Sequence, residues 1–296
     1  MARLISLVED RSPSLREVSA ALTPHTGSAH IVGITGSPGV GKSTSTSALV
    51  TALRAQGKRV GVLAVDPTSP FSGGALLGDR VRMQDHATDH GVYIRSMASR
   101  GHLGGLSASA PQALRVLDAA GCDVVLVETV GVGQSEVEIA GLADTTLVLL
   151  APGMGDGIQA AKAGILEIGD IFVVNKADRD GAQSTRRELR SMLSMTERED
   201  SAWKPPIVLT VATRGEGVDE VAEQVAAHRA HLGESGEFER RRLARLRREI
   251  EALALAEVQS RFAGLSGDAR LDALASQVLA GETDPFAAAD TLVENV

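Results

Sequence analysis

A glycine-rich segment near the start of the chain carries the residues with the clearest chemistry. Residues 36–43 read Gly-Ser-Pro-Gly-Val-Gly-Lys-Ser and fit the pattern GxxxxGK[ST] at every fixed position. Glycines here let backbone N–H groups turn inward around phosphate oxygens, while Lys42 can reach the β- and γ-phosphates and the Ser43 hydroxyl can ligate Mg²⁺. We therefore predict a nucleoside triphosphate site that is formed by Gly36, Ser37, Pro38, Gly39, Val40, Gly41, Lys42 and Ser43.

A second motif indicates which base is bound. Asn175, Lys176 and Asp178 fit the pattern NKxD directly after an apolar run. A carboxylate at Asp178 can accept from both the ring N–H and the exocyclic amine of guanine, whereas adenine presents a different edge. Asn175 and Lys176 can brace the loops around the base. Further on, Val211, Ala212 and Thr213 take the place of a small-residue base loop. They depart from the usual Ser-Ala pair, so we expect them to contribute backbone N–H groups.

Acidic residues at the ends of apolar runs are candidates for a metal site. Glu128-Thr129-Val130-Gly131 takes the place of a DxxG switch, with Glu instead of Asp. Its carboxylate can hold the Mg²⁺ shell, and the Gly131 N–H can sense the γ-phosphate. Asp66 and Asp79 are further candidates, and a helix cap or a surface acid is the alternative for each. We predict Ser43, Asp66, Asp79 and Glu128 at the metal, and Lys42 and Glu128 as the catalytic groups.

A charge for the transition state can come from several arginines, among which the sequence does not choose: Arg80, Arg82, Arg95 and Arg100.

The elements that must position these residues follow from the apolar runs. Continuous Val, Leu and Ile runs are typical of strands that helices cover on both faces. They predict strands at 31–34, 59–65, 92–94, 123–127, 145–150, 171–174 and 207–211, with a helix over 43–56. The fold class is therefore α/β, a P-loop domain with a mostly parallel sheet. We expect a helical lead-in over 1–28, the nucleotide domain over 29–225 and a helical extension over 226–296.

Composition narrows the classes of function. Aromatic residues make up 2% of the chain and the formal net charge is −8, so neither single-stranded nucleic acid nor an anionic membrane is expected as a general partner. Cys122 is the single cysteine, and we interpret it as a small core residue in a reducing compartment. Neither a signal peptide nor a membrane-spanning stretch is evident. These features predict a cytoplasmic protein.

Several longer strings resemble one family, the MeaB/ArgK GTPases that are associated with methylmalonyl-CoA mutase. They are Asp66-Pro-Thr-Ser-Pro-Phe71, Gly73-Gly-Ala-Leu-Leu-Gly-Asp-Arg80, Arg100-Gly-His-Leu-Gly-Gly105, Glu128-Thr-Val-Gly-Val-Gly-Gln-Ser135 and Pro152-Gly-Met-Gly-Asp156. The resemblance covers residues 1–225 and is weaker beyond them. It implies a dimeric, Mg²⁺-dependent GTPase that acts as a chaperone of adenosylcobalamin-dependent acyl-CoA mutases, gates cofactor loading and protects the mutase.

The resemblance also extends the nucleotide site and gives the C-terminal helices a role. It implies GTP or GDP contacts from Gly36 to Thr44, at Asp178 and from Val211 to Thr213. It implies a dimerisation arm in the C-terminal helices, which would supply a partner for the stripe Leu243, Leu246, Ile250 and Leu253. Packing within the chain is the alternative for that stripe.

Two other functions remain open at this stage. One is a kinase of a lysine/arginine/ornithine transport system, an older label for the family. The other is a metal-delivery GTPase, which the scattered histidines and the single Cys122 do not favour.

Overall fold

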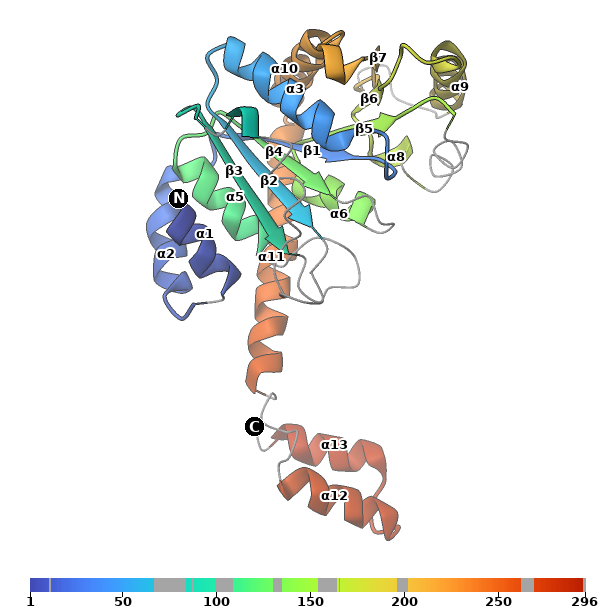
Figure 1. Cartoon of the computed structure of the whole chain (residues 1–296). Coiled ribbons are helices and arrows are strands. Elements are labelled where there is room, and N and C mark those ends of the chain that lie inside the picture. The colour runs from blue at the N-terminus through green and yellow to red at the C-terminus, as the bar shows by residue number, and fades with distance from the viewer. Residues whose placement is uncertain are drawn as a thin grey trace. The chain divides into compact units, whose positions relative to one another are not determined.

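Figure 1 shows the computed structural model of the chain. It describes residues 1–10, 12–66, 84–86, 88–98, 109–129, 135–153, 164, 166–195, 202–261 and 269–294. The chain forms two compact units, Met1–Arg241 and Arg242–Val296.

A seven-stranded sheet lies at the centre of the first unit, in the order β3-β2-β4-β1-β5-β6-β7. Every neighbouring pair of these strands is parallel. The strands are β1 (His30–Thr35), β2 (Val60–Asp66), β3 (Val92–Ala98), β4 (Val124–Thr129), β5 (Thr145–Leu150), β6 (Ile171–Val174) and β7 (Ile207–Leu209). The predicted α/β class with a parallel sheet is confirmed.

Five strands differ from their predicted bounds, and β1, β2 and β4 do so by one or two residues at an end. β3 runs on to Ala98, because its residues pair in unbroken register with β2 as far as Asp66. β7 ends at Leu209 instead of Val211, because Val211 turns away to pair in antiparallel fashion with Glu216. The ends of β3 and β7 thus depend on pairing partners, which a single apolar run does not reveal.

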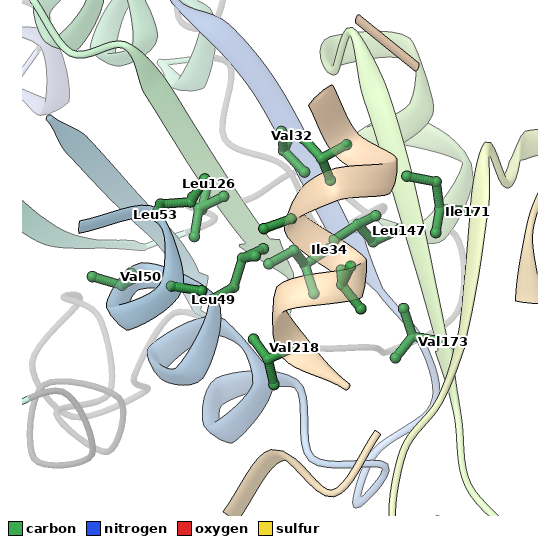
Figure 2. Packing of buried hydrophobic residues seen from close by; sticks show 14 of the residues in the cluster. Val32, Ile34, Leu49, Val50, Leu53, Leu126, Leu147, Ile171, Val173 and Val218 are labelled. Atoms are coloured by element: carbon green, nitrogen blue, oxygen red, sulfur yellow. The ribbon is translucent and has the colours of Figure 1, made fainter. Parts of the chain in front are cut away.

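Helices α3 (Lys42–Ala55) and α10 (Val218–Glu234) cover one face of the sheet. Figure 2 shows Leu49 of α3 extending toward Ile34 and Leu53 lying beside Leu126. Val50 of α3 and Val218 of α10 belong to the same buried cluster. Alternate residues of β1, Val32 and Ile34, belong to this cluster. This is the two-residue alternation of a strand that is buried on both faces.

The opposite face is covered by α5 (Ala110–Ala119), α6 (Ser135–Leu142) and α9 (Ala182–Ser194). Ile31 of β1 packs on this side with Ile139 of α6. Cys122 lies buried in the same cluster, as predicted for a small core residue. Burial raises the pKa of its thiol to about 11.

The helices at the start of the chain pack on this second face. They are α1 (Ala2–Glu9), α2 (Leu15–Leu22) and the short η1 (Thr23–His25). Ile5 and Val8 of α1 are buried against α5. Arg95 of β3 forms an ion pair with Glu9 and donates a hydrogen bond to Ser6. Of the four candidate arginines, Arg95 therefore serves to hold α1.

The remaining helices complete the chain. They are η2 (Gln84–His86), α8 (Leu166–Ile168), η4 (Ala212–Arg214), α11 (Glu237–Arg261), α12 (Ala269–Leu279) and α13 (Pro285–Glu294). Within the second unit, α12 contacts α13. Among the described helices, none has the length and apolar character that crossing a membrane requires.

The amino end of the sheet is held by a buried carboxylate. Asp170, just before β6, accepts two hydrogen bonds from the Arg241 guanidinium at 3.0 Å and one from the Thr146 N–H at 2.8 Å. The indole N–H of Trp203 donates to the Asp170 carbonyl. A two-pronged Arg–carboxylate pair is among the strongest side-chain contacts. It ties the start of α11 to β5 and β6.

Two buried histidines extend this network. Thr145 Oγ lies 2.8 Å from both His30 Nε2 and His228 Nδ1, and His228 Nε2 lies 3.4 Å from Asp170. Burial lowers the pKa of His228 to about 4, because desolvation of the imidazolium outweighs the attraction of Asp170. Arg241, Glu237 and His231 also act on this group. His228 is therefore neutral at pH 7 in the folded protein.

This depressed pKa predicts acid sensitivity. Between pH 6.5 and about 4 the unfolded chain binds a proton at His228 that the folded chain does not. The free energy of unfolding should thus fall as the pH falls through that window, by up to about 3 kcal/mol from this group. Urea unfolding across the window checks this. His228→Gln should flatten the slope, whereas exposed His25→Gln should keep it; equal slopes in both variants would contradict the assignment.

Candidate nucleotide and metal site

The glycine-rich segment leaves β1 and enters α3 at Lys42 at the carboxyl edge of the sheet. Gly36 and Gly41 have φ angles of 142° and 97°, which disfavour other residues. A Cβ atom on Gly36 would lie 2.3 Å from the Leu149 carbonyl oxygen, and a Cβ atom on Gly41 would lie 2.5 Å from Asn175 Nδ2. The loop therefore packs directly on β5 and on the NKxD segment. Gly41 supplies no side-chain cap to α3, and the positive end of the helix adjoins the loop.

Lys42 folds over this loop. Its ammonium donates hydrogen bonds to the carbonyls of Gly36 at 2.7 Å and Ser37 at 3.3 Å, and the residue is buried. These bonds place the cation against the backbone of the phosphate loop. Phosphate oxygens are stronger acceptors for an ammonium than neutral carbonyls, so they can take over its hydrogen bonds.

Ser43 and Glu128 meet across the edge of the sheet. The Ser43 hydroxyl lies 2.6 Å from Glu128 Oε1, and the Thr46 hydroxyl lies 3.1 Å from Oε2. All three residues are buried. Glu128 reaches this place because β4 pairs with β1 so that Glu128 lies opposite Ile34. A hydroxyl and a carboxylate are the hard oxygen ligands that Mg²⁺ prefers, so the pair fits that cation.

The two aspartates that were predicted at the metal are placed only in part. The backbone of Asp66 ends β2 at the same edge, one residue beyond the pairing of Val65 with Thr129. Its side chain lies outside the described residues, as does the whole of Asp79. Arg80, Arg82 and Arg100 lie outside them too.

Asn175 joins the phosphate loop to the base loop. Its Nδ2 donates to the Val40 carbonyl at 2.9 Å, and its Oδ1 accepts from the Thr210 hydroxyl at 3.2 Å and the Ala212 N–H at 3.1 Å. The residue is 3% exposed. Every polar atom of the amide is thus engaged with one loop or the other.

Lys176 makes a parallel contact with the same loop. Its ammonium donates to the Gly39 carbonyl at 2.6 Å. Lys176 has a φ angle of 57°, which makes it the one non-glycine residue with positive φ in the described part of the chain. Such a conformation costs about 1–3 kcal/mol and persists only where the surroundings enforce it. The contacts of Asn175 and Lys176 with the phosphate loop hold the NKxD segment in place and enforce this backbone conformation.

The base loop follows β7 as a closed turn. Val211 and Ala212 are buried, and Thr213 is exposed in the short helix η4. Asp178 is half-exposed and forms an ion pair with Arg214, whose Nη2 lies 3.1 Å from Oδ2. The sequence did not single out Arg214 as a site residue, although its position directly after the base loop indicates that it lies near the base.

Comparisons with known proteins place the chain among GTPases. The family model described as methylmalonyl Co-A mutase-associated GTPase MeaB matches residues 1–266. A Pyrococcus horikoshii protein that is provisionally named a GTPase is 50% identical, over the whole of this chain and 93% of its own length. GTPase ArgK of Escherichia coli is 39% identical over 81% of this chain and 74% of its own. The methylmalonic aciduria type A homolog of Caenorhabditis elegans is 37% identical over 88% of this chain and 67% of its own.

Solved structures share the fold. One described as a LAO/AO transport system kinase is 28% identical, with a TM-score of 0.72 over 99% of this chain and 91% of its own. HypB from Helicobacter pylori, solved in complex with nickel, is 17% identical, with a TM-score of 0.51 over 72% of this chain and 94% of its own. At that identity the HypB likeness concerns the fold alone.

The position of Asn175 predicts that its loss weakens nucleotide binding. Asn175→Ala leaves the Val40 carbonyl, the Thr210 hydroxyl and the Ala212 N–H without their partner. Each buried group that loses its partner costs about 1–3 kcal/mol. We expect weaker GDP binding in calorimetry and a lower urea midpoint. Ser184→Ala, at a partly exposed residue of α9 whose hydroxyl contacts Glu188, should change neither. An Asn175→Ala variant with undiminished GDP affinity would contradict the bridging role.

Proposed function

The chain belongs to the MeaB family of methylmalonyl-CoA mutase-associated GTPases, and from that premise we propose that this GTPase is a nucleotide-dependent chaperone of an adenosylcobalamin-dependent acyl-CoA mutase. In this role it gates loading of the cofactor and protects the mutase. Methylmalonyl-CoA mutase is the proposed partner, and the cytoplasm the proposed compartment. The observation that carries the proposal is the contact of Ser43 with Glu128 at 2.6 Å, which joins the phosphate loop to the end of β4.

The nucleotide lies, in this proposal, along the carboxyl edge of the sheet. The loop from Gly36 to Thr44 holds the phosphates, and Lys42 supplies the positive charge. Asp178 accepts from the guanine base. Its supports are Asn175 and Lys176, whose side chains reach the phosphate loop at Val40 and Gly39. Val211, Ala212 and Thr213 border the base from the neighbouring loop.

Ser43 and Glu128 would hold Mg²⁺, with Asp66 and Asp79 as further ligands. Bound Mg²⁺ would neutralise phosphate charge during hydrolysis. The Ser43 hydroxyl links two parts of the site, because Ser43 belongs to the phosphate loop and its hydroxyl donates a hydrogen bond to Glu128. Any change in the hydrogen bonding of Ser43 therefore alters the hydrogen bonding of Glu128 at the end of β4. We propose that Glu128 in this way reports whether GTP or GDP is bound.

A true kinase is the second candidate. The LAO/AO transport system kinase structure, which covers 99% of this chain, is the observation that favours it. GTP carrying a labelled γ-phosphate separates the two functions. Free labelled phosphate is the product of a GTPase switch, whereas label on a protein acceptor is the product of a kinase.

The chaperone function predicts a nucleotide-dependent complex. The full chain should bind purified methylmalonyl-CoA mutase with different affinity in GDP and in a non-hydrolysable GTP analogue, and adenosylcobalamin transfer to the apo-mutase should follow the same difference. Equal mutase affinity in both nucleotide states would contradict the proposal.

Lys42→Ala should lower GTP turnover about 100-fold or more, because the phosphates lose a positioned charge. Arg229→Ala removes an exposed arginine that contacts Ser28 and is the matched control.

The second unit supports a proposed homodimer. Leu243, Leu246, Ile250 and Leu253 follow one side of α11, and each is at least 43% exposed. Large apolar side chains that recur at this spacing form a stripe that a second helix can cover. A second copy of the chain supplies an identical stripe, so we propose a dimer through α11.

Sedimentation equilibrium tests the dimer. Leu246→Glu together with Ile250→Glu should shift the mass from two chains to one, because a carboxylate cannot be buried in an apolar seam without large cost. Ala244→Glu places the same charge on an exposed residue off the stripe and should leave the dimer intact. A single-chain mass for the unaltered protein would end this proposal.

A further inference from the structure

An arginine is attached to the carboxylate that is assigned to the base. Arg214 Nη2 lies 3.1 Å from Asp178 Oδ2, and Arg214 Nε lies 3.2 Å from Glu216 Oε1. The guanidinium thus lies between two acids from different segments: Asp178 from the loop after β6, and Glu216 from the turn that follows the base loop. All three side chains are about half-exposed, so a ligand at this edge can reach them.

The base loop gives this arginine a defined position. Val211 pairs with Glu216 across the turn, and its N–H donates to the Glu216 carbonyl at 3.0 Å. Gly215 and Gly217 both have positive φ, and a Cβ atom on Gly217 would lie 2.1 Å from the Leu209 carbonyl. The turn between them is therefore tightly restricted. Because the backbone is held, the side chains of Arg214 and Glu216 leave it from fixed points.

The geometry of the ion pair leaves room for a base. The contact joins Arg214 Nη2 to Asp178 Oδ2 at 3.1 Å. A carboxylate has about four lone-pair sites, so Asp178 retains acceptor capacity for two further donors. Val211 stands where the usual base loop has Ser and has no hydroxyl to donate. Arg214 supplies the donor that such a loop otherwise lacks.

We propose that Arg214 is a positioning residue that orients the Asp178 carboxylate toward guanine and thereby sets base specificity. The inference rests on the proposed assignment of Asp178 to the base. Guanine uses two donors, the ring N–H and the exocyclic amine, so its binding requires both carboxylate oxygens in one orientation. Hypoxanthine lacks the amine and needs a single oxygen. A carboxylate that is free to rotate should therefore lose more affinity for guanine than for hypoxanthine.

Calorimetric binding of GDP and IDP to the full chain tests this role. Arg214→Ala should lower GDP affinity about two- to fivefold, the range for an exposed ion pair. IDP affinity should fall less, so that the GDP-to-IDP ratio declines. Because an exposed pair is screened by salt, the loss should shrink as ionic strength rises. Arg229→Ala removes an exposed arginine at the opposite edge of the sheet and should leave the ratio unchanged. An unchanged ratio in Arg214→Ala, or tighter GDP binding, would overturn the inference.

A double-mutant cycle separates this inference from the site on which it rests. Asp178→Asn exchanges an acceptor for a donor and should move preference from GDP to XDP. In that background Arg214→Ala should have no further effect on the GDP-to-IDP ratio, since the carboxylate that it orients is gone. If Asp178→Asn keeps full GDP preference, the assignment of Asp178 fails. If it shifts preference but Arg214→Ala acts equally with and without Asp178, only the role of Arg214 fails.

Discussion

The pairing of β1 with β4 sets Ile34 opposite Glu128 at the carboxyl edge of the sheet. The chain leaves β1 one residue later and returns through the glycine loop into α3, which brings Ser43 to 2.6 Å from Glu128. A shift in register by one residue would turn Glu128 to the other face of the sheet. The contact between the phosphate loop and the carboxylate thus depends on backbone hydrogen bonds between two strands, supported by the helices on both faces.

Asn175 extends this dependence to the base. β6 ends beside β5, and the Asn175 N–H donates to the Leu150 carbonyl at 2.8 Å. Its side chain then connects Val40 on the phosphate loop with Ala212 on the base loop. A single buried amide therefore holds the phosphate loop and the base loop at a fixed separation. The strained backbone of Lys176 persists because these contacts enforce it.

The carboxyl edge and the amino edge of the sheet carry polar groups with different roles. At the carboxyl edge, Asp178 and Arg214 are half-exposed and the Lys42 ammonium donates to the carbonyls of Gly36 and Ser37, so a ligand can compete for these groups. At the amino edge, the carboxylate of Asp170 is enclosed by Arg241 and Thr146, with Trp203 on its carbonyl. A buried ion pair is costly to break, because one partner is left charged without compensation. The amino edge thus stabilises the fold while the carboxyl edge retains groups for chemistry.

The sequence by itself determined the fold class, the family and most strand positions, because buried strands and glycine-rich phosphate loops are local patterns. β5 and β6 have the bounds that their apolar runs predict. It did not reveal the early end of β7, the use of Arg95 by α1, or the pairing of Arg214 with Asp178. The last two are contacts between segments far apart in the chain, and the early end of β7 follows from the pairing of Val211 with Glu216. Residue spacing carries the period of a helix or a strand, but the partner of a side chain is decided only when strand order and register bring the segments together.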